Sequence, residues 1–173
     1  DGSLNTFAKP TNVDTNARIL CYDIRDKMYD DYVLRIFGVG KIEHEIRDYI
    51  RKSNASEFIN LEGFSRNIHN IIRDASMYVS SSNYEGISNS MLEALAIGLP
   101  CICTDCPIGG PRMYINSYEN GILVPVNDKN ALVSAMVDIA SDEELSEKLS
   151  VNAEKIRYKL LPESIFERWE SLL

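Results

Sequence analysis

The sequence predicts an α/β protein with a Rossmann-like parallel sheet sandwiched by helices. Short β-branched and apolar runs alternate with helical patterns along the chain, which is typical of βα units joined by right-handed crossovers. The clearest unit is a strand, loop, helix and strand between Met77 and Thr104. No internal repeat, low-complexity segment or linker interrupts the pattern, so we expect residues 1–173 to form a single domain.

The first half of the chain is expected to begin with a polar loop and a helix. In residues 17–28, apolar side chains recur at spacings of three and four, which marks one face of a helix. Residues 33–40 form a dense β-branched and aromatic run, typical of a central strand. A helix is then expected at residues 42–52, a strand at 58–64, a helix around 68–72 and a strand at 77–80.

The second half begins with a helix from about residue 88. Gly98 and Pro100 mark its end, because glycine adopts the left-handed conformation easily and proline cannot continue a helix. Trp169, near the C-terminus, is expected to anchor packing. Further strands are expected at residues 101–104 and 122–126, and further helices begin at Asp128, Ser141 and Pro162.

Composition is that of an ordinary globular protein, with 45% hydrophobic and 25% charged residues. The net charge of −8 argues against nucleic acid or an anionic membrane as a general partner, since either favours a basic surface. No apolar run approaches the roughly 20 residues of a membrane span. The chain begins with Asp1 rather than Met, so we expect a fragment of a longer protein.

Three of the four cysteines, Cys101, Cys103 and Cys106, follow a C-x-C-x-x-C pattern that raises a metal-site hypothesis. In a strand, however, Cys101 and Cys103 share one face as small core residues, and both histidines lie far away in the sequence. We favour buried thiols over zinc, and reduced cysteines suit the cytoplasm.

The loop and helix after Ser80 carry the candidate chemistry. Ser90 and Glu93 have the spacing of a capping box, which is a purely structural alternative. Glu85 ends the preceding loop, so both glutamates can face a crevice at the carboxyl end of a parallel sheet, where ligands bind. A helix N-terminus there offers N–H groups to an anion, and Gly86 permits close approach of a ligand.

Three blocks follow one another in the second half of the chain: the run Tyr84 to Gly86 with Asn89 to Leu95 and Gly98 to Pro100, then Pro107 to Arg112, then Glu119 to Pro125. In this order they resemble the group 1 family of retaining glycosyltransferases with the GT-B fold. The first block resembles the family's donor-binding signature, and the other two resemble its next landmarks. The resemblance covers nearly the whole chain but only the C-terminal, donor-binding half of the family's enzyme. It implies that the N-terminal acceptor domain and the first strand are missing here.

The resemblance also implies roles for individual residues. Glu93 would accept hydrogen bonds from the ribose hydroxyls of a nucleotide sugar. The catalytic residues would be Glu85, which contacts hydroxyls of the donor sugar, and Lys9, which neutralises the departing diphosphate. Backbone N–H groups would face the sugar and diphosphate, and the base would lie near the loops that follow two of the strands. The implied donor-binding set is Gly86, Ile87, Ser88, Asn89, Ser90, Glu93, Ser3, Arg66 and Gly38.

Two positions depart from the family pattern. Ser3 stands where the family has an arginine that neutralises the departing diphosphate. Met113 stands where many relatives have a glutamate after Pro-Arg, although Arg112 is retained. For Lys9, Ser3 and Arg66, a solvated loop position is an equally good interpretation.

The implied reaction is transfer of a sugar from a nucleoside diphosphate, with UDP favoured, to a glycan or lipid-linked acceptor. Retention at the anomeric carbon and independence from metal belong to this expectation, and the sequence has no Asp-x-Asp triplet. No cofactor is expected. Rival hypotheses are a nucleotide-sugar-binding module that is inactive without its N-terminal domain, a GT-B-fold epimerase, and a receiver or flavodoxin-like domain.

The expected product is a cell-surface or secreted polysaccharide or a glycolipid. The expected location is the cytoplasm, with membrane association, peripheral at the inner face, only through missing parts of the protein. The base, the sugar, the acceptor and the oligomeric state are left open by the sequence.

Overall fold

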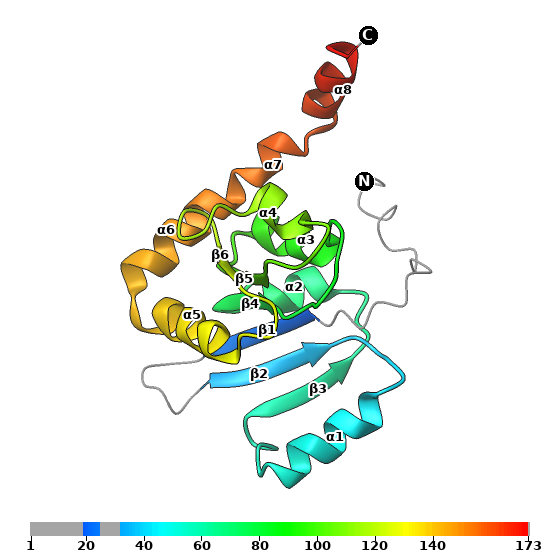
Figure 1. The fold of residues 1–173 in the computed structure, drawn as a ribbon, viewed down its shortest axis with the longest axis vertical. Helices are drawn as coiled ribbons and strands as arrows, with labels where there is room; N and C mark the ends of the chain where they lie inside the picture. Colours follow the sequence, from blue (N-terminus) through cyan, green and yellow to red (C-terminus); the bar gives the residue numbers. More distant parts are fainter. Residues whose placement is uncertain (1–18, 25–31, 173) are drawn as a thin grey trace.

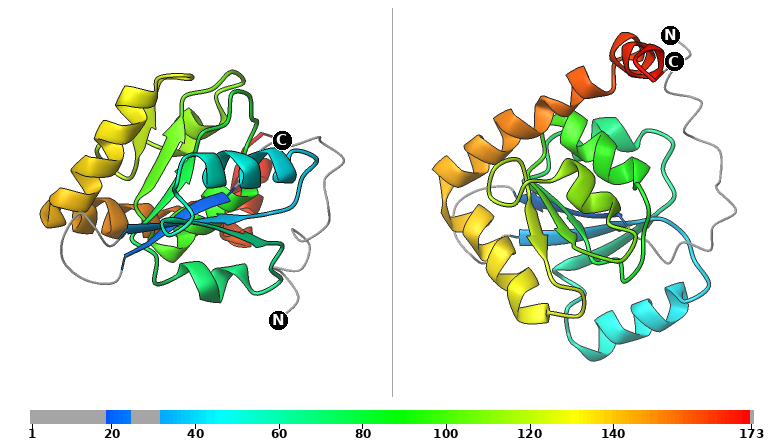
Figure 2. Two further views of the ribbon diagram at one scale, coloured as in Figure 1. Left: turned by 90° about the horizontal axis from the view of Figure 1, so that it is seen from below. Right: turned by 45° about the horizontal axis from the view of Figure 1, so that its top comes forward.

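The computed structural model describes residues 19–24 and 32–172 of the chain. Within these ranges one sheet has the strand order β3-β2-β1-β4-β5-β6, with helices on both faces (Figures 1 and 2). The strands are β1 (Ile19–Ile24), β2 (Tyr32–Phe37), β3 (Ile59–Gly63), β4 (Met77–Ser80), β5 (Cys101–Thr104) and β6 (Ile122–Val124). The α/β class predicted from alternating patterns is confirmed.

The helix expected over residues 17–28 is wrong where the structure describes it, because Ile19–Ile24 form β1. This strand pairs antiparallel with β2 on one side and β4 on the other. The parallel sheet is therefore interrupted at its centre, although β2 with β3 and β4 with β5 and β6 are parallel as predicted. Pairing with two neighbouring strands outweighs the helical spacing, which is a weak preference when tertiary partners are available.

The remaining elements agree closely with the predicted order, and two short helices, α4 and α7, are additions. The helices are α1 (Glu43–Lys52), α2 (Ile68–Ile72), α3 (Asn89–Ile97), α4 (Gly110–Tyr114), α5 (Lys129–Ser141), α6 (Glu143–Glu154), α7 (Ile156–Lys159) and α8 (Pro162–Glu170). Asp128 and Asp142 cap α5 and α6, since their side chains accept from the N–H groups of Ala131 and Leu145.

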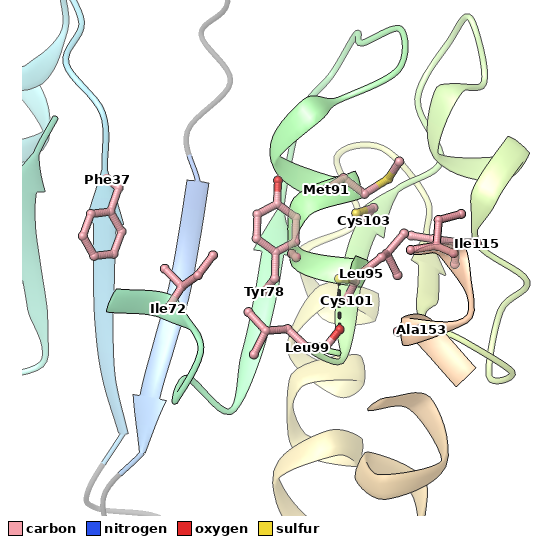
Figure 3. Close-up of a cluster of buried hydrophobic side chains, with 12 residues drawn as sticks. Phe37, Ile72, Tyr78, Met91, Leu95, Leu99, Cys101, Cys103, Ile115 and Ala153 are labelled. Carbon is pink, nitrogen blue, oxygen red and sulfur yellow. Dashed lines mark hydrogen bonds between the residues drawn. The ribbon is translucent and has the colours of Figure 1, made fainter. Parts of the chain in front are cut away.

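Alternating residues of the central strands face two separate core clusters. Tyr78, Cys101 and Cys103 lie in the first, which includes α3 and its end (Figure 3). Met77, Val79 and Ile102 lie in the second, with apolar residues of α5. Strands β4 and β5 are buried on both faces, as continuous apolar runs predict. The loops after these strands are thus held on a rigid base.

Helix α3 ends where the sequence predicts. Gly98 is left-handed with φ of 92°, and its N–H and that of Leu99 bond back to the carbonyls of Leu95 and Ala94. A Cβ atom on Gly98 would also lie 2.8 Å from Cγ of Glu154. The residue is therefore required both for its conformation and for the close approach of α6.

The packing role expected for Trp169 is wrong. Helix α8 extends away from the sheet at the top of Figure 1, and the Trp169 side chain is 67% exposed. Among the described residues, neither core cluster includes a residue of α8, so the indole does not pack into either of them. Among the described helices, none combines the length and apolar character that crossing a lipid bilayer demands.

Candidate functional site

The candidate site lies at one edge of the sheet. Because β1 is antiparallel to both β2 and β4, those two strands run in the same direction. The carboxyl ends of β2, β3, β4 and β5 therefore meet at a common edge. The loops that leave this edge carry Gly38, Arg66, Glu85 and Asp105 in turn. The topology therefore brings these four loops to the same edge of the sheet.

Glu85 is oriented by the loop that contains it. The hydroxyl of Ser82 donates to Oε2 of Glu85 over 2.8 Å. The hydroxyl of Thr104, at the end of β5, in turn donates to the carbonyl of Ser82. Within the described part of the chain, the other oxygen of Glu85, Oε1, accepts no hydrogen bond. One carboxylate oxygen is thus fixed internally while the second is available to a hydroxyl donor.

The backbone of Gly86 and Ile87 is pressed against the start of α4. A Cβ atom on Gly110 would lie 1.7 Å from the carbonyl oxygen of Gly86 and 2.9 Å from the amide nitrogen of Ile87. Only glycine fits at position 110, because no rotation of a side chain could relieve a clash with backbone. The contact fixes the peptide that follows Glu85.

Helix α3 begins two residues earlier than a Ser90–Glu93 capping box requires, so that structural alternative does not hold. Ser88 is the N-cap, and its hydroxyl accepts from the N–H of Met91 over 3.4 Å. Ser90 lies inside the helix, with its hydroxyl 2.9 Å from both Ser88 Oγ and Tyr78 Oη. The first turn still presents N–H groups toward the common edge, which is the feature an anion requires.

The hydroxyl of Tyr78, on β4, contacts the first turn of α3 through Ser90. Burial raises the pKa of its phenol well above the usual range, and the proximity of Cys103 adds to the effect. Burial likewise raises the pKa of the Cys103 thiol, followed by the charge of Glu85. Both groups therefore stay neutral at physiological pH. The phenol holds Ser90 in place without adding charge beneath the site.

Glu93 lies on α3, one turn beyond the loop, and meets α2. Its Oε2 atom lies 3.2 Å from Nε2 of His69, and the Glu93 side chain is 27% exposed. The carboxylate is therefore accessible from outside although part of it contacts the neighbouring helix. In the chain, Glu85 precedes the N-cap Ser88 and Glu93 lies on α3 beyond its first turn.

The other expected site residues lie on two neighbouring loops, at the start of α3, or outside the described residues. Gly38 and Arg66 are exposed on the loops after β2 and β3, and the N–H of Gly38 donates to the carbonyl of Gly63 over 2.8 Å. Ile87 and Asn89 are exposed beside Glu85, and Ser88 is buried as the cap. Lys9 and Ser3 lie outside the described residues.

Arg112 does not extend freely from α4. Its Nε atom lies 2.6 Å from Oδ1 of Asp105, and this hydrogen bond raises the pKa of the guanidinium. The pair connects the loop after β5 to α4, while Met113 next to it is exposed. Arg112 therefore holds the segment around Gly110 in position.

In the ranges 19–24 and 32–172, no three His, Cys, Asp or Glu side chains gather closely enough to hold a metal ion. Cys101, Cys103 and Cys106 are all buried, as small core residues should be. Cys101 donates to the carbonyl of Leu99 over 3.2 Å, visible as the dashed line in Figure 3.

Four residues of the site were not predicted: Ser82, Thr104, His69 and Gly110. Ser82 and Thr104 are polar residues at the ends of two neighbouring buried strands, a signal that a search for strand ends would find. Gly110 stands in the Gly109-Gly110-Pro111 run, where paired glycines indicate a close approach. His69 carries no local signal, because its contact depends on how α2 packs against α3.

The model of the family described as "Glycosyl transferases group 1" matches residues 16–156. Among curated proteins, the UDP-Gal:alpha-D-GlcNAc-diphosphoundecaprenol alpha-1,3-galactosyltransferase of Escherichia coli is 29% identical, over 72% of this chain and 32% of its own length. The poly(ribitol-phosphate) alpha-N-acetylglucosaminyltransferase of Staphylococcus aureus is 28% identical, over 79% of this chain and 28% of its own length.

Solved structures give the same result. A mutant of S. aureus TarM, in complex with Fondaparinux, alpha-GlcNAc-glycerol and UDP, superposes with a TM-score of 0.74 at 27% identity, over 80% of this chain and 28% of that one. The pneumococcal O-GlcNAc transferase GtfA, in complex with UDP and GlcNAc, superposes with a TM-score of 0.69 at 26% identity and the same coverage. The chain spans about a third of the length of the curated relatives it matches.

Proposed function

The chain belongs to the group 1 glycosyl transferases, and on this premise we propose that it is the donor-binding half of a retaining enzyme of the GT-B fold. Its ligand is a nucleoside-diphosphate sugar, with UDP as the preferred nucleotide. The observation that carries the proposal is the start of α3, which follows the carboxyl end of β4 and lies in the chain between Glu85 and Glu93.

Each part of this arrangement suits one part of the ligand. Oε1 of Glu85 and an accessible Glu93 carboxylate can each accept from hydroxyls, which matches a sugar and a ribose. Between them, the N–H groups of the first turn of α3 match the diphosphate. Gly38 and Arg66, on the neighbouring loops, lie where the base would extend.

UDP is favoured by the relatives. The E. coli relative is named for UDP-Gal, and the structures of TarM and GtfA that superpose on this chain contain UDP. Nothing in the described residues distinguishes uracil from guanine by a specific hydrogen bond. UDP is therefore proposed because relatives bind it, whereas the contacts with the diphosphate and the hydroxyls are proposed from the positions of Glu85, Glu93 and the first turn of α3.

The proposed reaction breaks the bond between the anomeric carbon and the diphosphate oxygen and forms one from that carbon to a hydroxyl oxygen of the acceptor, whose proton passes to the departing phosphate. Negative charge develops on the departing phosphate, so the preorganised N–H groups of α3, joined by Lys9, stabilise the transition state more than the ground state. Glu85, held by Ser82, orients the sugar so that the acceptor approaches the carbon with retention. We propose that no metal ion takes part.

The acceptor, a glycan or a lipid-linked sugar, is proposed to bind an N-terminal domain that this chain does not include, since the chain spans about a third of its relatives. The same fact favours a second candidate function, a module that binds the nucleotide sugar but transfers nothing alone. The buried thiols of Cys103 and Cys106 suit a reducing compartment and support a cytoplasmic location.

Calorimetric titration of the chain with UDP, GDP and their sugar conjugates tests the proposal. We expect micromolar to millimolar affinity for one diphosphate, weakened about ten-fold or more by Glu93→Ala. Glu147→Ala is the matched control, because Glu147 is exposed on α6, away from the site. Absence of binding by every nucleotide, or equal loss in the control, would contradict the proposal.

A further inference from the structure

His69 and Glu93 form a contact between two helices that are separate in the sequence. Nε2 of His69 lies 3.2 Å from Oε2 of Glu93, yet the ring N–H direction is not aligned for a full hydrogen bond. The Nε2 atom is shielded from solvent, and the contact with Oε2 of Glu93 is its one polar contact among the residues that the structure describes. A shielded polar atom without an aligned partner is costly, so Nε2 favours a nearby carboxylate oxygen.

The histidine is held where it is by its own helix. Ile72 is buried in the first core cluster, and Ile68 packs against that cluster (Figure 3 shows Ile72). His69 lies on α2 between these two anchors, and its side chain keeps 44% of its surface exposed. The imidazole is thus presented to α3 by a fixed backbone rather than by a mobile loop.

This contact restricts the Glu93 carboxylate. A glutamate side chain has three rotatable bonds, and fixing them when a ligand binds costs conformational entropy. With Oε2 drawn toward Nε2, the other oxygen, Oε1, accepts no hydrogen bond within the described ranges. The carboxylate is therefore oriented before the ligand arrives, with one oxygen left for a hydroxyl.

We propose that His69 is a positioning residue, which orients Glu93 for the ribose hydroxyls of the nucleotide. The inference rests on the proposed function, since it presumes that Glu93 meets ribose. It predicts that removing the imidazole weakens binding only for ligands that carry those hydroxyls.

Calorimetry on the 173-residue chain tests this with UDP and 2′,3′-dideoxyuridine diphosphate. We expect His69→Ala to weaken UDP binding roughly three- to ten-fold and to leave the dideoxy ligand unaffected. His69→Phe keeps the ring volume without the nitrogen and should behave like alanine, whereas His69→Gln keeps a donor and should recover part of the affinity. His44→Ala, an exposed histidine on α1, is the matched control.

A double-mutant cycle tests whether His69 acts through Glu93. In a Glu93→Ala background, His69→Ala should cause no further loss, because its effect passes through the carboxylate. The inference would be overturned if His69→Ala lowered UDP affinity equally in the Glu93→Ala background, or lowered affinity equally for the dideoxy ligand. It would also be overturned if the folded His69 variants bound UDP normally. None of these outcomes would contradict the proposed function. If the unmodified chain does not bind UDP, both this inference and the proposal that UDP is the preferred nucleotide are overturned. Thermal melting of each variant verifies that it is folded.

Discussion

Gly110 approaches Gly86 so closely that a Cβ atom on Gly110 would lie 1.7 Å from the Gly86 carbonyl oxygen. Gly86 lies in the loop after β4 and Gly110 begins α4, so their contact fixes the position of the peptide beside Glu85. We expect Gly110→Ala to push this loop and α4 apart. The stability should fall by about 1–3 kcal/mol, and nucleotide binding should weaken with it.

Gly86→Ala is the matched comparison for stability, since a Cβ there meets nothing within 4 Å. Urea unfolding of both variants measures the difference. Equal midpoints for the two variants would show that the loops yield to the added carbon at no cost, against the expectation.

The bond from Ser82 to Glu85 predicts an effect on the sugar rather than the nucleotide. Ser82→Ala removes a hydrogen bond of 2.8 Å to the carboxylate, which is worth about 1 kcal/mol or somewhat more with a charged acceptor. The variant should bind a UDP-sugar such as UDP-GlcNAc less tightly and UDP itself as before. Ser81→Ala, exposed in the same loop, serves as control. A loss of UDP affinity as large as that of the sugar conjugate would argue against this role.

Stability should decline at alkaline pH. The pKa values of Cys103 and Tyr78 are raised in the folded chain, chiefly by burial. Unfolded thiols and phenols lose protons near about pH 8.5 and 10, so above those values the unfolded state binds fewer protons and gains stability. The contribution of these groups to the free energy of unfolding is complete below about pH 8.5. Above the unfolded-state pKa of each group, it falls by up to about 1.4 kcal/mol per pH unit.

Denaturant midpoints measured from about pH 7 to about pH 11 provide the check. Cys103→Ala should flatten the slope between about pH 9 and 10, whatever it does to the midpoint at neutral pH. An unchanged slope would mean that the thiol does not contribute as expected.

Leu149 and Trp169 should respond to truncation in opposite ways. Leu149 on α6 is fully buried in the second core cluster, so Leu149→Ala should cost about 2–5 kcal/mol. Trp169→Ala removes a larger side chain that is 67% exposed and should change stability by less than about 0.5 kcal/mol. Thermal melting of the two variants tests the contrast. Comparable losses would imply that α8 is packed in solution.

Local patterns predicted most of the fold correctly. The α3 end followed from Gly98, the start of α5 from the capping Asp128, and the buried strands from continuous apolar runs. Residues 19–24 were mispredicted because their spacing of three and four is satisfied by a helix, while the structure pairs them with two strands distant in sequence. The packing role of Trp169 was mispredicted for a related reason, because an apolar stripe does not reveal whether a partner surface exists.

The candidate site was predictable where motifs lie in one stretch. Glu85, Gly86 and Ser88 to Glu93 follow one another, so a resemblance can identify them together. The contacts of Ser82 with Thr104 and of His69 with Glu93 join segments that are more than twenty residues apart. Such contacts depend on crossover geometry, which no local pattern encodes.

The antiparallel strand β1 has a consequence for how the chain folds. It joins a two-stranded parallel group, β2 with β3, to a three-stranded one, β4 with β5 and β6. Its pairing with β4 joins Leu20 to Val79, a long loop to close, so this step is expected to come late. Until then both groups present open edges that invite pairing with another chain. The solubility of the nascent protein therefore depends on six residues whose only sequence signal resembles a helix.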